Sequence, residues 1–79
     1  MKIEILGSGC PKCKTTEKNI KKAVEKLGIH ADIIKVEDLQ EIMNRGIIVT
    51  PAVFIDGKVK IVGRVPSKEE LEKIIKNND

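Results

Sequence analysis

The chain has 79 residues, of which 41% are apolar and 34% are charged, and its formal net charge is +3. This length and composition predict one globular domain, residues 1–79, rather than a disordered chain. Nucleic-acid binders usually combine basic charge with stacking aromatics or a recognisable reading element. Phe54 is the only aromatic residue, so we expect no nucleic-acid partner.

The chain contains no apolar run long enough to cross a bilayer, and its first residues, MKIEIL, contain no targeting segment. We therefore expect a cytoplasmic protein without a membrane partner, and a monomer. Lysines cluster between residues 14 and 26, where they form either a solvated helix face or a docking surface for an acidic protein.

A strand, a long helix and a second strand are predicted first along the chain. Residues 2–6, KIEIL, are rich in β-branched side chains and are followed closely by glycines, as is typical of a short strand. Apolar residues then recur at helical spacing from Pro11 to Leu27, with proline suited to the first turn and Gly28 to the stop. Residues 31–36, ADIIKV, predict the second strand.

The second half of the chain predicts a short helix, a hairpin and a closing helix. A capping box that starts at Asp38 precedes a short apolar helix face formed by Leu39, Ile42 and Met43. Asp56 and Gly57, between VFI and KVKIV, are a strong signal for a two-residue hairpin turn. A second capping box, at Ser67, opens the last helix.

The predicted order is β-α-β-α-β-β-α, which defines an α/β fold. A right-handed crossover makes the first two strands parallel, and the hairpin adds antiparallel pairing. We therefore expect a four-stranded mixed sheet with helices on both faces.

Both cysteines of the chain, Cys10 and Cys13, lie in the segment GSGCPKC. A structural zinc site needs four ligands, and the only histidine, His30, lies at the far end of the predicted helix, so we expect no zinc. Two thiolates alone could still hold Cu(I). As a structural staple the pair closes a very short loop, worth only about 2 kcal/mol in the chain-entropy model.

Redox chemistry fits the position of the pair better. Residues three apart on a helix lie about 5–6 Å apart between Cβ atoms, close to disulfide distance. Cys10 falls at the helix start, where the dipole and Lys12 favour a thiolate. Cys13 falls on the apolar stripe and should be shielded. This asymmetry predicts an attacking thiol and a resolving thiol.

The chain resembles the minimal thioredoxin fold found in glutaredoxins. The resemblance lies in the order of its elements: a strand, the CPKC helix, a second strand, a second helix, TP, a hairpin and a closing helix. The resemblance covers essentially the whole chain and is closest to the small redox-active disulfide proteins of archaea and bacteria, a group of the thioredoxin superfamily. It implies a thiol–disulfide oxidoreductase, an electron carrier for cell redox homeostasis that reduces protein disulfides through a Cys10–Cys13 disulfide. No cofactor or metal is implied, and a disulfide reductase would supply the electrons.

The same resemblance implies roles for further residues. Pro51 would follow Thr50 through a cis peptide bond, face the cysteines and contact an extended substrate, beside Pro11 and Lys12 of the motif. Glu4 stands six residues before Cys10, where thioredoxins place a buried acid that accepts the proton of the resolving cysteine. From the residues alone, we favour for Glu4 an ordinary carboxylate at the rim of the sheet, paired with Lys2 or Lys35.

Some residues depart from the family pattern. Gly9 stands where thioredoxins usually have tryptophan, and Lys12 stands where glutaredoxins usually have tyrosine. Gly63 and Arg64 replace the paired glycines with which glutaredoxins hold glutathione. The sequence therefore leaves open whether glutathione or a reductase is the electron donor.

Two other functions fit part of the sequence. A Cu(I) chaperone with a ferredoxin-like fold also has CxxC after its first strand, but it usually has methionine where this chain has Ser8. Its β-α-β-β-α-β order also needs a final strand that the last residues do not provide. The other alternative is a docking module that keeps the fold without catalysis.

Overall fold

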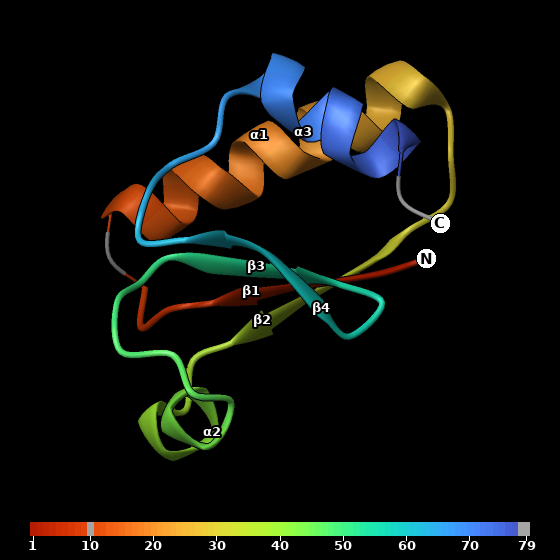
Figure 1. The fold of residues 1–79 in the computed structure, drawn as a ribbon. Coiled ribbons are helices and arrows are strands. Elements are labelled where there is room, and N and C mark those ends of the chain that lie inside the picture. Colours follow the sequence, from red (N-terminus) through yellow and green to blue (C-terminus); the bar gives the residue numbers. More distant parts are fainter. Residues whose placement is uncertain (10, 78–79) are drawn as a thin grey trace.

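Four strands form one mixed sheet in the computed structural model, which describes residues 1–9 and 11–77 (Figure 1). The strands are β1 (Lys2–Leu6), β2 (Asp32–Val36), β3 (Ala52–Ile55) and β4 (Lys58–Val62). The helices are α1 (Pro11–Leu27), α2 (Leu39–Asn44) and α3 (Lys68–Lys76). The predicted order of elements is confirmed, and it differs from the ferredoxin-like order because α2 separates β2 from β3 and α3 follows β4.

The sheet has the strand order β2-β1-β3-β4. β1 pairs with β2 in parallel and with β3 antiparallel, and β4 continues antiparallel on β3. The two central strands are buried along nearly their whole length, because helices cover both faces of the sheet. The predicted four-stranded mixed sheet is therefore confirmed.

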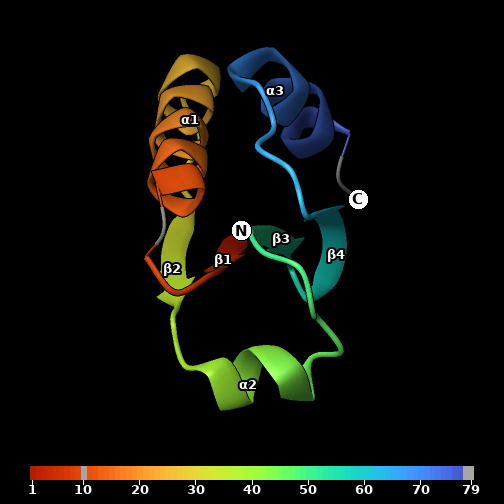
Figure 2. The same cartoon turned by 90° about the vertical axis from the view of Figure 1, so that its left-hand side faces the viewer.

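Helices α1 and α3 cover one face of the sheet, and α2 alone covers the other. Figure 2 shows α1 above the side of β2 and α3 above the side of β4, with α2 below. The core under α1 and α3 is aliphatic and consists of Ile3, Ile5, Ile20, Ala23, Val53, Ile55, Ile61, Leu71 and Ile75. The smaller core under α2 consists of Leu6, Ile42, Ile47, Ala52 and Phe54. Alternate residues of β1 thus enter different cores, as the pleat of a strand requires.

Local signals explain most of these boundaries. Asp56 (φ 50) and Gly57 (φ 85) both take the left-handed conformation that the predicted two-residue turn demands. The Ser67 side chain accepts a hydrogen bond from the backbone N–H of Glu70 (3.1 Å) and so caps α3. The second strand begins at Asp32, one residue later than predicted.

The predicted apolar face of α2 is only partly correct. Ile42 is buried at 3% exposure, whereas Leu39 and Met43 are each 64% exposed. A helix of six residues has fewer than two turns, so only one of its apolar side chains reaches the core.

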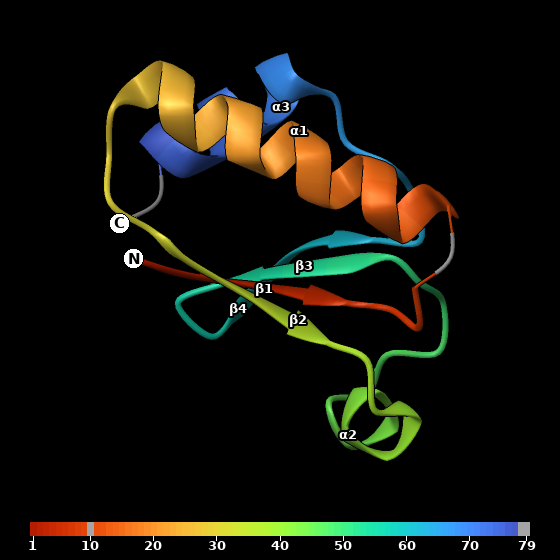
Figure 3. The ribbon, with the colours of Figure 1, turned by 180° about the vertical axis from the view of Figure 1, so that it is seen from behind.

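One end of the sheet brings together segments that are distant in the sequence. Four segments lie close together there: the end of β1, the start of α1, the loop before β3 and the turn after β4 (Figure 1). The view from behind shows the same arrangement (Figure 3). This end of the sheet contains Cys13, Thr50 and Pro51, three of the residues that the sequence predicts for the site.

Candidate active site

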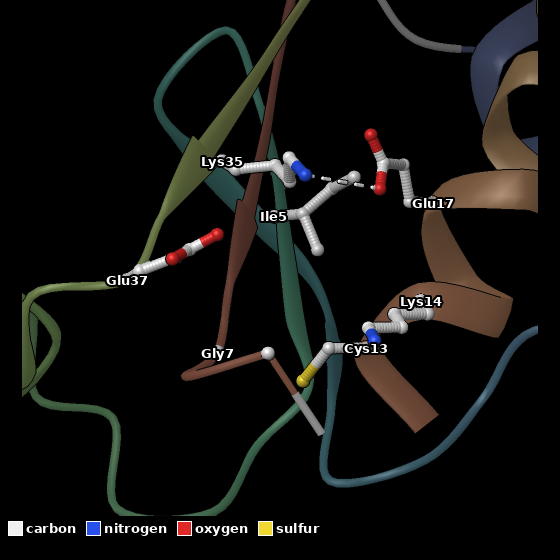
Figure 4. Close-up of a pocket in the computed structure, with 8 residues that line it drawn as sticks. Ile5, Gly7, Cys13, Lys14, Glu17, Lys35 and Glu37 are labelled. Atoms are coloured by element: carbon white, nitrogen blue, oxygen red, sulfur yellow. Dashed lines mark ion pairs between the residues drawn. The ribbon is translucent and has the colours of Figure 1, made fainter. Parts of the chain in front are cut away.

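Cys13 lies at the start of α1 and packs against the end of β1. Its side chain is buried, with 6% exposure, and Figure 4 shows its sulfur directed toward Gly7. A Cβ atom built on Gly7 would lie 2.2 Å from Cys13 Sγ and 3.8 Å from Thr50 Cβ. The thiol therefore occupies space that only a glycine leaves open. The predicted shielding of Cys13 is confirmed, whereas Cys10, the predicted attacking thiol, lies outside the described residues.

Substituting Gly7 with alanine should displace the Cys13 thiol. The φ of Gly7 lies outside the left-handed region, so the substitution tests the contact rather than backbone strain. We expect a loss of about 1–3 kcal/mol in the free energy of unfolding, as for other overpacked sites, measured by urea denaturation. We also expect faster alkylation of Cys13. Ser8→Ala, at the exposed neighbouring position, is the control, and equal stability and thiol reactivity in both variants would contradict the packing role.

The peptide bond between Thr50 and Pro51 is cis, as the family resemblance implied. Pro51 is buried and Thr50 is half-buried. The Pro51 carbonyl accepts a hydrogen bond from the backbone N–H of Gly63 (2.8 Å), which ties the loop before β3 to the turn after β4. Because Thr50 lies beside Gly7, the proline loop and Cys13 belong to one site, although the contact of this loop with a substrate stays a prediction.

Pro11 and Lys12 form the exposed first turn of α1. Their carbonyl groups accept hydrogen bonds from the hydroxyls of Thr15 (3.0 Å) and Thr16 (2.8 Å), respectively. The prediction that Pro11 opens the helix is confirmed. Both side chains are available to a partner, but no described contact tests their predicted role in substrate binding.

Glu4 is buried at 4% exposure and binds a residue that sequence analysis did not single out. Arg45 Nη2 donates a hydrogen bond to Glu4 Oε2 at 2.5 Å, and Arg45 Nε donates one to Glu41 Oε1 at 3.1 Å. The hydrogen bond from Arg45 outweighs the effect of burial and, with the charges of Arg45 and Lys2, holds the pKa of the Glu4 carboxyl below its usual range. The Arg45 guanidinium also lies 5.4 Å from the centroid of the Phe54 ring.

The favoured interpretation of Glu4 was therefore partly wrong. The carboxylate is not at the rim, and Lys35 pairs with Glu17 instead (3.5 Å), although Lys2 does lie 4.0 Å from Glu4. A buried carboxylate needs a strong partner, and α2 delivers Arg45 to the same face. Because alternate residues of β1 face opposite sides, Glu4 faces α2, whereas Cys13 lies on α1, which covers the other face of the sheet. The structure does not bring the two side chains together.

A cavity of about 60 Å³ lies beside Cys13 and is lined by Ile5, Gly7, Gly9, Cys13, Lys14, Glu17, Lys35 and Glu37 (Figure 4). Glu17 Oε1 lies 3.5 Å from Lys35 Nζ, and Glu17 Oε2 lies 3.2 Å from Lys21 Nζ. Burial raises the pKa of the Glu17 carboxyl, but hydrogen bonds and charges from Lys21 and Lys35 outweigh it and leave the pKa below its usual range. Sequence analysis missed this group, although the four-residue spacing of Cys13 and Glu17 places both on one helix face.

Within residues 1–9 and 11–77, no three His, Cys, Asp or Glu side chains gather so that they could hold a metal ion. His30 is exposed and directly precedes the strand region, as predicted. None of the helices in the described part of the chain is both long and apolar enough to cross a membrane.

The fold and this site, with a buried cysteine at a helix start beside a cis proline, define a thioredoxin-like protein. Similarity to known proteins supports the same class, because the family model for the thioredoxin domain matches residues 1–76. A protein named thioredoxin from Methanothermobacter thermautotrophicus is 45% identical over 75 residues, which cover 95% of this chain and 97% of that protein. Another thioredoxin, from Methanocaldococcus jannaschii, is 48% identical over 95% of this chain and 86% of its own length.

A third relative, named probable thioredoxin, comes from Methanothermobacter marburgensis and is 32% identical over 90% of this chain and 87% of its own. The chain therefore belongs to the thioredoxin superfamily, as its sequence motifs predicted. Its function is a thioredoxin-like redox function, that of an oxidoreductase.

Proposed function

We propose that this protein reduces disulfide bonds in other proteins by thiol–disulfide exchange, with Cys10 as the attacking thiol and Cys13 as the resolving thiol. The observation that carries the proposal is the buried Cys13 thiol, packed on Gly7 and next to the cis Thr50–Pro51 bond. Cys10 stands three residues earlier in the sequence, directly before the first residue of α1. The pair thus combines a shielded thiol with one at a helix start, where a thiolate is favoured.

The exchange takes place in two steps. The Cys10 thiolate attacks one sulfur of the substrate disulfide, which breaks that S–S bond, forms a mixed disulfide and releases the first substrate thiolate. The Cys13 thiolate then attacks Cys10 sulfur, which breaks the mixed disulfide, forms the Cys10–Cys13 disulfide and releases the second thiolate. The substrate gains two electrons, and the two protons lost by the cysteines balance those taken up by the substrate thiolates. A disulfide reductase would supply the two electrons that return the pair to its reduced state.

The surface beside Cys13 supports a protein substrate. Ile48 is 93% exposed, Val49 is 49% exposed and Val62 is 49% exposed. Ile48 and Val49 directly precede Thr50–Pro51, and Val62 directly precedes Gly63, which binds the Pro51 carbonyl. An apolar surface around a thiol site suits a protein substrate, whose disulfide is flanked by apolar side chains, better than it suits a small charged thiol compound. In this proposal, Thr50 and Pro51 contact the substrate chain, and Pro11 and Lys12 lie along its other side.

The test is reduction of insulin with dithiothreitol as the electron source. We expect the reduced protein to accelerate precipitation of the insulin B chain clearly above the rate with dithiothreitol alone, because the thiolate at the helix start attacks faster than a free dithiol. Protein whose thiols have been alkylated with iodoacetamide is the control. No acceleration, together with tight stoichiometric Cu(I) binding by the reduced protein, would instead support the copper-chaperone alternative.

A further inference from the structure

The cavity beside Cys13 contains charged groups from two different elements. Lys14 and Glu17 come from α1, Lys35 comes from β2, and Glu37 follows β2. Its volume of about 60 Å³ exceeds what a single water molecule requires, so the thiol can be hydrated from this side. Among the described residues, these four side chains supply the charged groups that line the cavity next to the Cys13 sulfur.

We propose that the Glu17–Lys35 ion pair controls how readily the Cys13 thiol loses its proton to water in this cavity. Both are positioning residues, since they act through Cys13. The inference rests on the proposed function, in which Cys13 must become a thiolate before it can attack the mixed disulfide.

The positions of Glu17 and Lys35 decide whether each residue promotes or opposes loss of the Cys13 proton. Glu17 is four residues from Cys13 on the same helix face, and such positions have Cβ atoms about 5–6 Å apart. The Glu17 side chain is only 17% exposed, so its negative charge opposes a thiolate at Cys13 with reduced screening by solvent. Lys35 lies across the cavity on β2, 3.5 Å from that carboxylate, which it neutralises together with Lys21 of α1 (3.2 Å). The charge of Lys35 itself favours the thiolate. Lys35 thus promotes loss of the proton, and Glu17 restrains it.

The carboxylate that the family resemblance marked for proton transfer is not available for this task. Glu4 is bound by Arg45 at 2.5 Å, and it lies in the smaller core with Leu6 and Phe54 rather than under α1. Glu17 and Lys35 occupy instead the face of the sheet on which Cys13 packs, as Figure 4 shows.

The test is titration of the Cys13 thiol in a Cys10→Ser background, in which the ultraviolet absorbance of the thiolate reports one cysteine only. Lys35→Met should raise the pH midpoint of thiolate formation by about 0.5 to 1, and Glu17→Gln should lower it by a similar amount. Lys35→Arg keeps the charge and should restore a midpoint close to that of the background protein. Circular dichroism verifies that each variant is folded.

Two matched controls separate this effect from a general change of charge. Lys60→Met removes a lysine from β4, the opposite edge of the sheet, and Glu25→Gln removes a carboxylate from α1 two turns beyond Glu17. Neither should move the midpoint. Equal midpoints in Lys35→Met and Lys60→Met, or shifts of the same sign in Lys35→Met and Glu17→Gln, would overturn the proposal. Because the titration needs no substrate, failure of the insulin assay would refute the proposed function without deciding this inference.

Discussion

Replacing Cys10 with serine should reduce insulin disulfide reduction by roughly 100-fold or more, because the thiolate is the nucleophile and a serine hydroxyl stays protonated at neutral pH. Replacing Cys13 with serine should abolish turnover in a different way. Cys10 can still attack, but the mixed disulfide then has no resolving thiol. Mass spectrometry of the Cys13→Ser variant incubated with an oxidised protein substrate should therefore find the two chains covalently joined.

The double variant Cys10→Ser/Cys13→Ser is the control for this experiment and should form no adduct. If Cys13→Ser forms no adduct while Cys10→Ser does, the assignment of attacking and resolving thiols is reversed. If Cys10→Ser keeps full biological activity and partner binding, the protein acts as a docking module rather than as a reductase. Proteins trapped on Cys10 of the Cys13→Ser variant would identify natural substrates.

Replacing Arg45 with methionine should lower the free energy of unfolding by about 3–5 kcal/mol, the usual cost of leaving a buried charge without its partner. Glu4 is 4% exposed, and the substitution removes its hydrogen bond from Arg45 together with the contact between the guanidinium and Phe54. Urea denaturation measures this loss. Glu4→Gln/Arg45→Met should recover most of it, since a neutral amide no longer needs a cation.

An exposed ion pair provides the comparison for Arg45. Arg64 and Glu70 are also paired, but Arg64 lies at the surface, and exposed pairs contribute little to stability. Arg64→Met should therefore leave the unfolding curve almost unchanged. If Arg45→Met is no less stable than Arg64→Met, then the Glu4–Arg45 pair does not hold α2 on the sheet.

The same pair makes stability depend on pH. The pKa of Glu4 is lowered in the folded protein, so its contribution is fully present above the pKa of the unfolded chain and is lost as the pH falls through the folded pKa. The free energy of unfolding of the wild type should therefore decrease more steeply between about pH 5 and pH 2 than that of Glu4→Gln.

Several features of the fold follow from local sequence and were correctly predicted. The strand at residues 2–6, with its β-branched residues and following glycines, the helical stripe that begins at Cys13 and the Asp56-Gly57 turn each depend on neighbours along the chain. Composition, periodicity and turn chemistry therefore suffice to predict them. The shielding of Cys13 belongs to the same group, because it follows from its place on the apolar stripe.

Other features depend on how distant segments meet, and the sequence did not predict them. Glu4 and Arg45 are 41 residues apart, and their pairing requires α2 to cross the face of the sheet opposite to α1. The exposure of Leu39 and Met43 has the same origin, since the position of a short helix decides which of its side chains reaches the core.

The active site divides in the same way. By itself, the sequence determined that two cysteines stand at a helix start after a strand and that a Thr-Pro pair precedes a hairpin, because these are statements about order and spacing. Only the tertiary structure decided that Gly7 leaves room for the Cys13 sulfur and that Lys35 reaches Glu17 across a cavity. Contacts of this kind depend on the register of β1 against β2 and on the position of α1 on the sheet. No local sequence pattern encodes either of these.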